Sequence, residues 1–247
     1  MKFLGVLSAL MLAMSCAAPA AQAGFGAPAV IPDRLPPAPV LGEAPAVRYS
    51  RLDRAACERE LTRRGIAFTR VDEARGVLAP VRLEGALHGV TYRTGLSAAK
   101  RATSPWEIVD CRLALALDDF AAELATRGVV EVLHYSIYRP PPARWPAGRI
   151  GTRHAGGLAI DAAAFIKKDG EKLDVLRDFH GRIGAPTCGH GATPHPETPA
   201  ADELRAIFCR AVAARLFNVA LSPDFNWPHR NHFHLEVAVG SRGEYVR

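Results

Sequence analysis

Two stretches of the chain carry apolar residues at the spacing of a helix with one buried face. The first runs from Cys111 to Arg127 and is followed by Gly128, a residue type that commonly ends helices. The second runs from Leu204 to Phe217. Their apolar positions are Leu113, Leu117, Phe120, Ala121 and Leu124 in the first, and Leu204, Ile207, Phe208, Ala211, Val212 and Leu216 in the second. A shorter helix is predicted from Ala55 to Arg64, where Gly65 closes it.

Strands are predicted where apolar and β-branched residues gather in short runs. These runs are Val129 to Ser136, Leu158 to Ile160, and His232 to Val239 near the end of the chain. The region from Ala67 to about Ser104 is predicted to hold further strands and loops. Because the helices and strands do not alternate regularly, the pattern indicates an α+β domain.

The start of the chain has the pattern of an export signal. Lys2 precedes an apolar run from Phe3 to Ala13, and Ala21 to Ala23 forms an A-x-A cleavage pattern. The run is too short to span a bilayer. Residues 1–23 are therefore predicted to be a signal peptide, and the protein to be periplasmic or secreted. The alternative is a lipid anchor at Cys16, although the residues before it lack the usual leucine.

A segment rich in proline and alanine follows the predicted signal. Such a segment cannot bury a core, so residues 24–48 are predicted to form an extended tether. The folded domain is predicted to cover residues 49–247.

Four cysteines remain after the predicted cleavage: Cys57, Cys111, Cys188 and Cys209. An even number in an exported chain indicates two disulfides, and four cysteines allow three pairings. Pairing of near neighbours in the chain would join Cys57 to Cys111 and Cys188 to Cys209. Zinc binding by the thiols is disfavoured because no C-x-x-C occurs.

The chain is basic, with a net charge of +6 and a pI near 9.3. Such a charge suits work beside an anionic cell envelope. The basic residues are scattered and are not interleaved with aromatic residues, so the pattern does not indicate nucleic-acid binding.

Candidate chemistry is concentrated in two segments, Thr152 to Asp161 and Trp227 to Glu236. In the second, strand alternation would put His232 and His234 on one face, with the intervening Phe233 in the core. His229 lies on the approach to the same face. In the first segment, Gly156 and Gly157 allow a sharp bend that would bring His154 towards Asp161. One carboxylate and two imidazoles suit Zn²⁺ with one position open to water.

These segments resemble known zinc peptidases. Thr152 to Asp161 resembles the S-x-H-x-x-G-x-A-x-D signature of the lysostaphin/D-Ala-D-Ala carboxypeptidase/hedgehog (LAS-type) peptidases, with Thr152 in place of serine. His229 to His234 is similar to the H-x-x-H-x-H end of the penicillin-insensitive murein endopeptidases. From about Cys57 onward the chain resembles bacterial extensin-like C-terminal domain proteins, which commonly carry Asp where Asn231 stands here.

The resemblance implies a small antiparallel sheet flanked by helices, and a zinc ion held by His154, Asp161 and His234. It also implies that His232 is the catalytic histidine, which takes a proton from the attacking water and passes it to the leaving amine. His229 would orient His232 or the water. Arg139 follows a predicted strand, and related peptidases place there an arginine that can hold a substrate carboxylate or a developing oxyanion.

The expected function is hydrolysis of peptide bonds in peptidoglycan. The E-x-x-H pattern of the carboxypeptidase branch is missing, which favours an endopeptidase-like reaction. Two other functions stay open: a non-catalytic protein of the envelope that contains zinc or binds peptidoglycan peptides, and a periplasmic zinc carrier. A carrier usually has a His-rich acidic loop, which this chain lacks.

Overall fold

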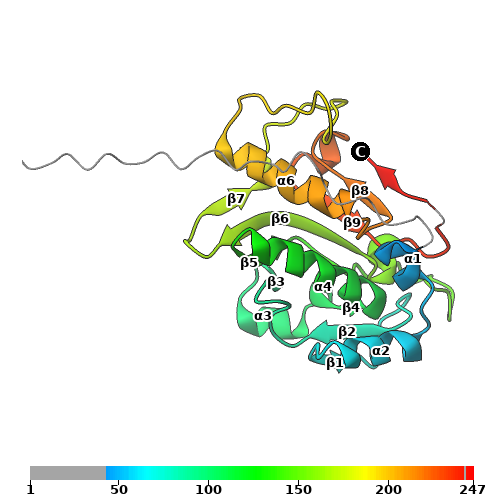
Figure 1. Cartoon of the computed structure of the whole chain (residues 1–247). Helices are drawn as coiled ribbons and strands as arrows, with labels where there is room; N and C mark the ends of the chain where they lie inside the picture. The colour runs from blue at the N-terminus through cyan, green and yellow to red at the C-terminus, as the bar shows by residue number, and fades with distance from the viewer. Residues whose placement is uncertain (1–42, 242) are drawn as a thin grey trace, which may run out of the picture. The chain divides into compact units, whose positions relative to one another are not determined.

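A computed structural model describes residues 43–241 and 243–247 (Figure 1). The predicted signal peptide, Cys16 and most of the predicted tether lie outside these residues. The described part of the chain combines helices with two β-sheets, so the predicted α+β class is confirmed.

The smaller sheet is antiparallel and has the strand order β1-β2-β4. The larger sheet has the order β10-β8-β9-β6-β5-β3, and β7 pairs with β6. It is mixed, because β3 runs parallel to β5 and β10 parallel to β8. The strands are β1 (Phe68–Arg70), β2 (Pro80–Leu83), β3 (Thr91–Thr94), β4 (Val109–Asp110), β5 (Val129–His134), β6 (Ala159–Lys167), β7 (Lys172–Asp174), β8 (Val219–Leu221), β9 (Phe233–Glu236) and β10 (Tyr245–Val246).

Two long helices, α4 (Cys111–Thr126) and α6 (Pro199–Ala213), pack on the larger sheet (Figure 1). Phe120 of α4 meets Phe165 of β6 edge to face, and Phe208 of α6 meets Phe233 of β9 in the same way. The predicted apolar stripes therefore face the sheet. The second helix begins earlier than its stripe suggests, because the Thr198 side chain accepts a hydrogen bond from the Ala201 amide and Pro199 occupies the first turn. It ends at Ala213, before the end of the stripe.

The shorter helices are α1 (Pro45–Ser50), α2 (Arg54–Arg63), α3 (Ala98–Thr103) and α5 (Val175–Asp178). The predicted helix before Gly65 corresponds to α2, and Gly65 has the expected positive φ of 70°.

Helix α1 corrects the predicted end of the tether at residue 48. Ala44, Ala46 and Val47 are each only 1 % exposed, and the Ala46 amide donates to the carbonyl of Arg215. These small apolar residues pack into the domain, and Pro45 is tolerated because it occupies the first helical turn. The folded domain thus begins before Tyr49.

Strand β6 contains a register shift that matters for the site. His134 of β5 lies opposite Ala162, and its neighbour in β5, Leu133, lies opposite Ala164. One step along β5 therefore corresponds to two steps along β6. The extra residue, Ala163, is a β-bulge, which reverses the faces of the residues after it. Phe165 can therefore enter the core beneath the helices although Asp161, four residues earlier, points away from it.

Both predicted disulfides are present, Cys57–Cys111 and Cys188–Cys209. They are separated by 54 and 21 residues along the chain. Among the described residues, no helix has the length and apolar character needed to cross a membrane.

Removing a disulfide should lower the free energy of unfolding, and the loss should be larger for the disulfide that closes the longer loop. We expect Cys57→Ala with Cys111→Ala to lower the free energy of unfolding by about 4 kcal/mol, and Cys188→Ala with Cys209→Ala by about 3 kcal/mol. Urea denaturation of both double variants measures the loss of stability.

Thiol titration of the unfolded, unreduced protein lacking residues 1–23 should find no free cysteine, and two or more free thiols would contradict the pairing.

Candidate metal centre and its cleft

The pairing of β6 with β9 brings the two motifs together. Asp161 lies directly opposite His234, and β9 is held on its other side by β8. Phe233 and Leu235 are fully buried in the core, so His234 projects from the opposite face, as alternation predicts. Strand β9 begins at Phe233, so His232 lies in a bend just before the strand rather than in it.

The glycines after His154 make the bend that the sequence predicts. His154 sits in a 3₁₀ turn, Arg153–Gly156, and Gly157 follows with a φ of 63°. A Cβ on Gly156 would lie 2.4 Å from the Gly151 carbonyl oxygen, so only glycine fits there. The turn delivers His154 to the start of β6.

One carboxylate oxygen is the centre of the site. Asp161 Oδ1 lies 3.1 Å from His154 Nε2, 3.0 Å from His234 Nδ1 and 3.2 Å from His232 Nε2. The side chains of Asp161 and His234 are 3 % and 8 % exposed, and those of His154 and His232 are each 12 % exposed. The four residues predicted as ligands and catalytic histidine therefore form one cluster.

Two of these histidines have a partner on their outer nitrogen. His154 Nδ1 lies 2.8 Å from the Ile137 carbonyl oxygen, to which it can only donate. His232 Nδ1 lies 2.8 Å from Asn231 Oδ1. In both rings Nε2 faces Asp161, so Nε2 is the nitrogen that could offer its lone pair to a metal ion in place of a proton. The amide of Asn231 thus supplies an acceptor to His232 without adding a negative charge.

Arg139 contacts the carboxylate rather than standing apart from it. Its Nη2 donates to Asp161 Oδ2, and its Nε donates to Ser136 Oγ at 2.8 Å. The Arg139 amide also donates to the His154 carbonyl at 3.0 Å. The guanidinium thereby orients Asp161 so that Oδ1 faces the histidines, while half of the arginine side chain stays exposed.

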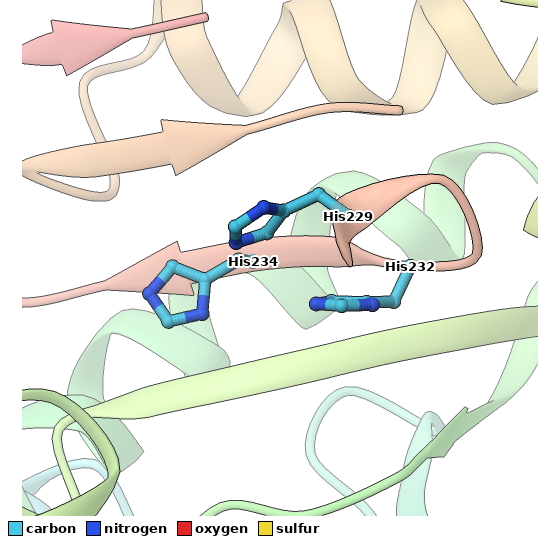
Figure 2. Close-up of side chains that lie close together, drawn as sticks. All are labelled: His229, His232 and His234. Carbon is cyan, nitrogen blue, oxygen red and sulfur yellow. The ribbon is translucent and has the colours of Figure 1, made fainter. Parts of the chain in front are cut away.

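His229 joins the cluster from a separate turn, Trp227–His229. Figure 2 shows its ring beside those of His232 and His234, next to β9. The ring centroids lie 5.2 Å from His232 and 5.7 Å from His234, and Nδ1 lies 2.6 Å from Asn226 Oδ1.

The charges of the cluster favour an ionised aspartate. Burial opposes its charge, but hydrogen bonds from His154, His232 and His234 outweigh burial and lower the pKa of Asp161 far below its usual range. Burial, and then electrostatic repulsion by the neighbouring His232 and His234 rings, lower the pKa of His229 to about 4. Near neutral pH the site therefore offers an anionic carboxylate and a neutral His229.

The donor atoms are spaced for a metal ion in two overlapping sets. The atoms of His154, Asp161 and His234 lie within 4.8 Å of one another, and so do those of His229, His232 and His234. The first set is more buried and includes the anionic oxygen, which a divalent cation favours. Its mixed nitrogen and oxygen donors fit Zn²⁺.

The cluster forms the floor of a cleft of about 890 Å³. Sequence reasoning did not single out several residues of its wall: Tyr135, Arg153, Phe225, Glu236 and Tyr245. Glu236 could have been found, because period-2 alternation from His232 and His234 reaches it. Arg153 stands out only in the structure. Its φ of 51° is strained for a non-glycine residue, and such strain is typical of functional sites.

Fold and site together define an α+β domain that is cross-linked by two disulfides and has a histidine–aspartate cluster in an open cleft. The family described as "Extensin-like protein C-terminus" matches residues 55–247, and the chain belongs to this family. Neither the curated proteins nor the solved structures gave a match.

Proposed function

We propose that this protein is an exported zinc metallopeptidase that hydrolyses peptide bonds in peptidoglycan. The observation that carries the proposal is the convergence of three imidazoles on Asp161 Oδ1 at the floor of an open cleft. Resemblance to the LAS-type peptidases supports the reaction class. The basic charge and the two disulfides are compatible with a site of action at the cell envelope.

His154, Asp161 and His234 would hold the ion. Zinc bound there supplies a Lewis acid and lowers the pKa of water to about 7. The polar partners of these residues, the Ile137 carbonyl and Arg139, keep the donor atoms aimed at one point before any ion binds.

His232 would act as the general base and acid. Its Nδ1 is directed at Asn231, so Nε2 is the nitrogen that takes a proton from the attacking water. The same nitrogen would return the proton to the amine of the cleaved peptide, a task suited to imidazole near neutral pH. His229 would help to position His232 or the water.

Two arginines would contact the substrate. Arg139 already holds Asp161, but its exposed guanidinium can still donate to a carbonyl oxygen that becomes negative during the reaction. Arg153 has a side chain that is 74 % exposed at the same cleft, and its nearest charged partner, Glu236, is 3.8 Å away. It is available for a carboxylate of the peptidoglycan peptide.

A specific observation also supports the non-catalytic alternative. His232 Nε2 lies 3.2 Å from Asp161 Oδ1, nearly as close as the nitrogens of His154 and His234. If it were a fourth ligand, the site would be closed and structural, as in proteins where zinc only stabilises the fold. The domain would then contain zinc, or bind peptidoglycan peptides, without cleaving them.

Digestion of peptidoglycan tests the proposal directly. The purified protein lacking residues 1–23 should release peptides with new amino and carboxyl ends, which mass spectrometry identifies. A chelator should stop the reaction, and added zinc should restore it. Stoichiometric zinc without any new product would reject the peptidase and favour the non-catalytic protein.

Metal removal should also destabilise the domain, because the three ligands join segments that are distant in the chain. Zinc at about 1,000 times its Kd contributes roughly 4 kcal/mol, equivalent to a shift of roughly 10 °C in Tm. Differential scanning calorimetry with zinc and with chelator measures the shift. An unchanged Tm in a protein shown to lose zinc would contradict a site built from both motifs.

A further inference from the structure

A buried carboxylate beside the cluster has no role in the proposed reaction. Glu236 is the last residue of β9, two positions after His234, and its side chain is only 5 % exposed. Among the described residues, its Oε2 atom has no hydrogen-bond partner. A buried polar oxygen without a hydrogen-bond partner is costly, so the groups nearest this oxygen are candidates for that partner.

Two groups lie near Glu236 Oε2. Arg153 Nε is 3.8 Å away, beyond hydrogen-bond distance, on a side chain that is largely in solvent. His234 Nε2 is 3.5 Å away, and its ring is almost as buried as the carboxylate. A small rotation of either side chain would bring the carboxylate and this ring nitrogen into hydrogen-bond contact, because both project from the same face of β9.

The nitrogen that faces Glu236 is the one that the metal would not use. His234 Nδ1 faces Asp161, so Nε2 is its outer nitrogen. His154 has the equivalent arrangement, with Nε2 inward and Nδ1 directed at the Ile137 carbonyl. Histidines that bind metals usually donate their outer N–H to a carboxylate or a carbonyl, which fixes the tautomer and the ring orientation.

We infer that Glu236 is a positioning residue of the metal centre, whose carboxylate accepts the Nε2–H of His234 and keeps the Nδ1 lone pair free for the ion. The inference rests on the zinc site of the proposed function, but it does not depend on peptide cleavage. His154 and His234 would then each be locked by a different outer partner, a backbone carbonyl and a carboxylate.

Zinc affinity measured by competition with a chromophoric chelator tests this role. Glu236→Ala should weaken zinc binding about 10- to 100-fold. Glu236→Gln keeps an oxygen that can accept the same N–H, so it should recover most of that loss. Glu58→Ala is the matched control, because Glu58 is also buried with an oxygen lacking a partner, yet it lies in α2 and outside the cleft wall. It should leave the zinc affinity unchanged.

Nitrogen NMR of the unaltered, zinc-loaded protein supplies a readout that does not depend on the folding of a variant. His234 should be protonated at Nε2 and metal-bound at Nδ1. The opposite tautomer, or a Glu236→Ala protein with unchanged affinity, would overturn the inference while leaving the peptidase proposal in place. An unaltered protein that binds zinc but cuts no peptide would reject the peptidase and leave Glu236 to be judged on affinity. Failure of the unaltered protein to bind zinc would overturn both.

Discussion

Replacement of His154 or His234 by alanine should abolish tight zinc binding, and with it any hydrolysis. Each removes a donor that contacts Asp161 Oδ1 at about the same distance, 3.1 Å for His154 and 3.0 Å for His234. We expect the affinity to fall more than about 100-fold, since loss of an outer partner alone costs 10- to 100-fold. Metal analysis after dialysis, with chelator competition for the affinity, measures the effect.

His229→Ala is the control that separates the two possible ligand sets. His234 belongs to both sets, whereas His154 belongs to one and His229 to the other. With the ion on His154, Asp161 and His234, the His229→Ala protein retains zinc and the His154→Ala protein loses it. The reverse result would assign the ion to the three histidines, and zinc retained by His234→Ala would remove both assignments.

Replacement of His232 by alanine should leave about one zinc per chain and yet reduce peptidoglycan hydrolysis by a factor on the order of 10² or more, the usual scale for a lost general base. The structure makes this the sharpest test of mechanism, because His232 Nε2 lies only 3.2 Å from Asp161 Oδ1 and could serve as base or as fourth ligand. Zinc content and product release must be measured on the same preparations.

The outcomes of the His232 experiment are distinct. Loss of zinc would make His232 a ligand and the site a closed, structural one. Retention of both zinc and full activity would exclude His232 as the base. His195→Ala, which changes an exposed histidine outside the cleft wall, should leave zinc content and activity unchanged.

The electrostatics of the site are compatible with the proposed division of roles among the histidines. Asp161 is held ionised by the surrounding hydrogen bonds, and Arg139 occupies its second oxygen. An imidazole that faces the first oxygen can therefore be a ligand or a proton carrier without changing the charge of the carboxylate. The outer nitrogens of the three rings face different oxygens: the Ile137 carbonyl for His154, the Asn231 amide for His232, and the Glu236 carboxylate for His234.

Much of this protein follows from short-range patterns in its sequence. The apolar spacing before Gly128 predicts α4, the alternation around Phe233 predicts that His234 projects away from the core, and Gly156 and Gly157 predict the bend after His154. These features depend on backbone preferences and on side-chain periodicity over a few residues. Both can be read from the order of neighbouring residues in the sequence. The pairing of nearest cysteines was also correct, although the sequence allowed two other pairings.

Tertiary structure decided what depends on segments distant in the chain. Asp161 and His234 are 73 residues apart, and only the pairing of β6 with β9 makes them neighbours. The bulge at Ala163, the contact of Arg139 with Asp161 and the packing of α1 against the domain have no local signature. They arise because burial of apolar surface and satisfaction of buried polar groups are settled for the whole domain at once. The sequence by itself therefore determined which residue types could form the site, and the fold decided which atoms face each other.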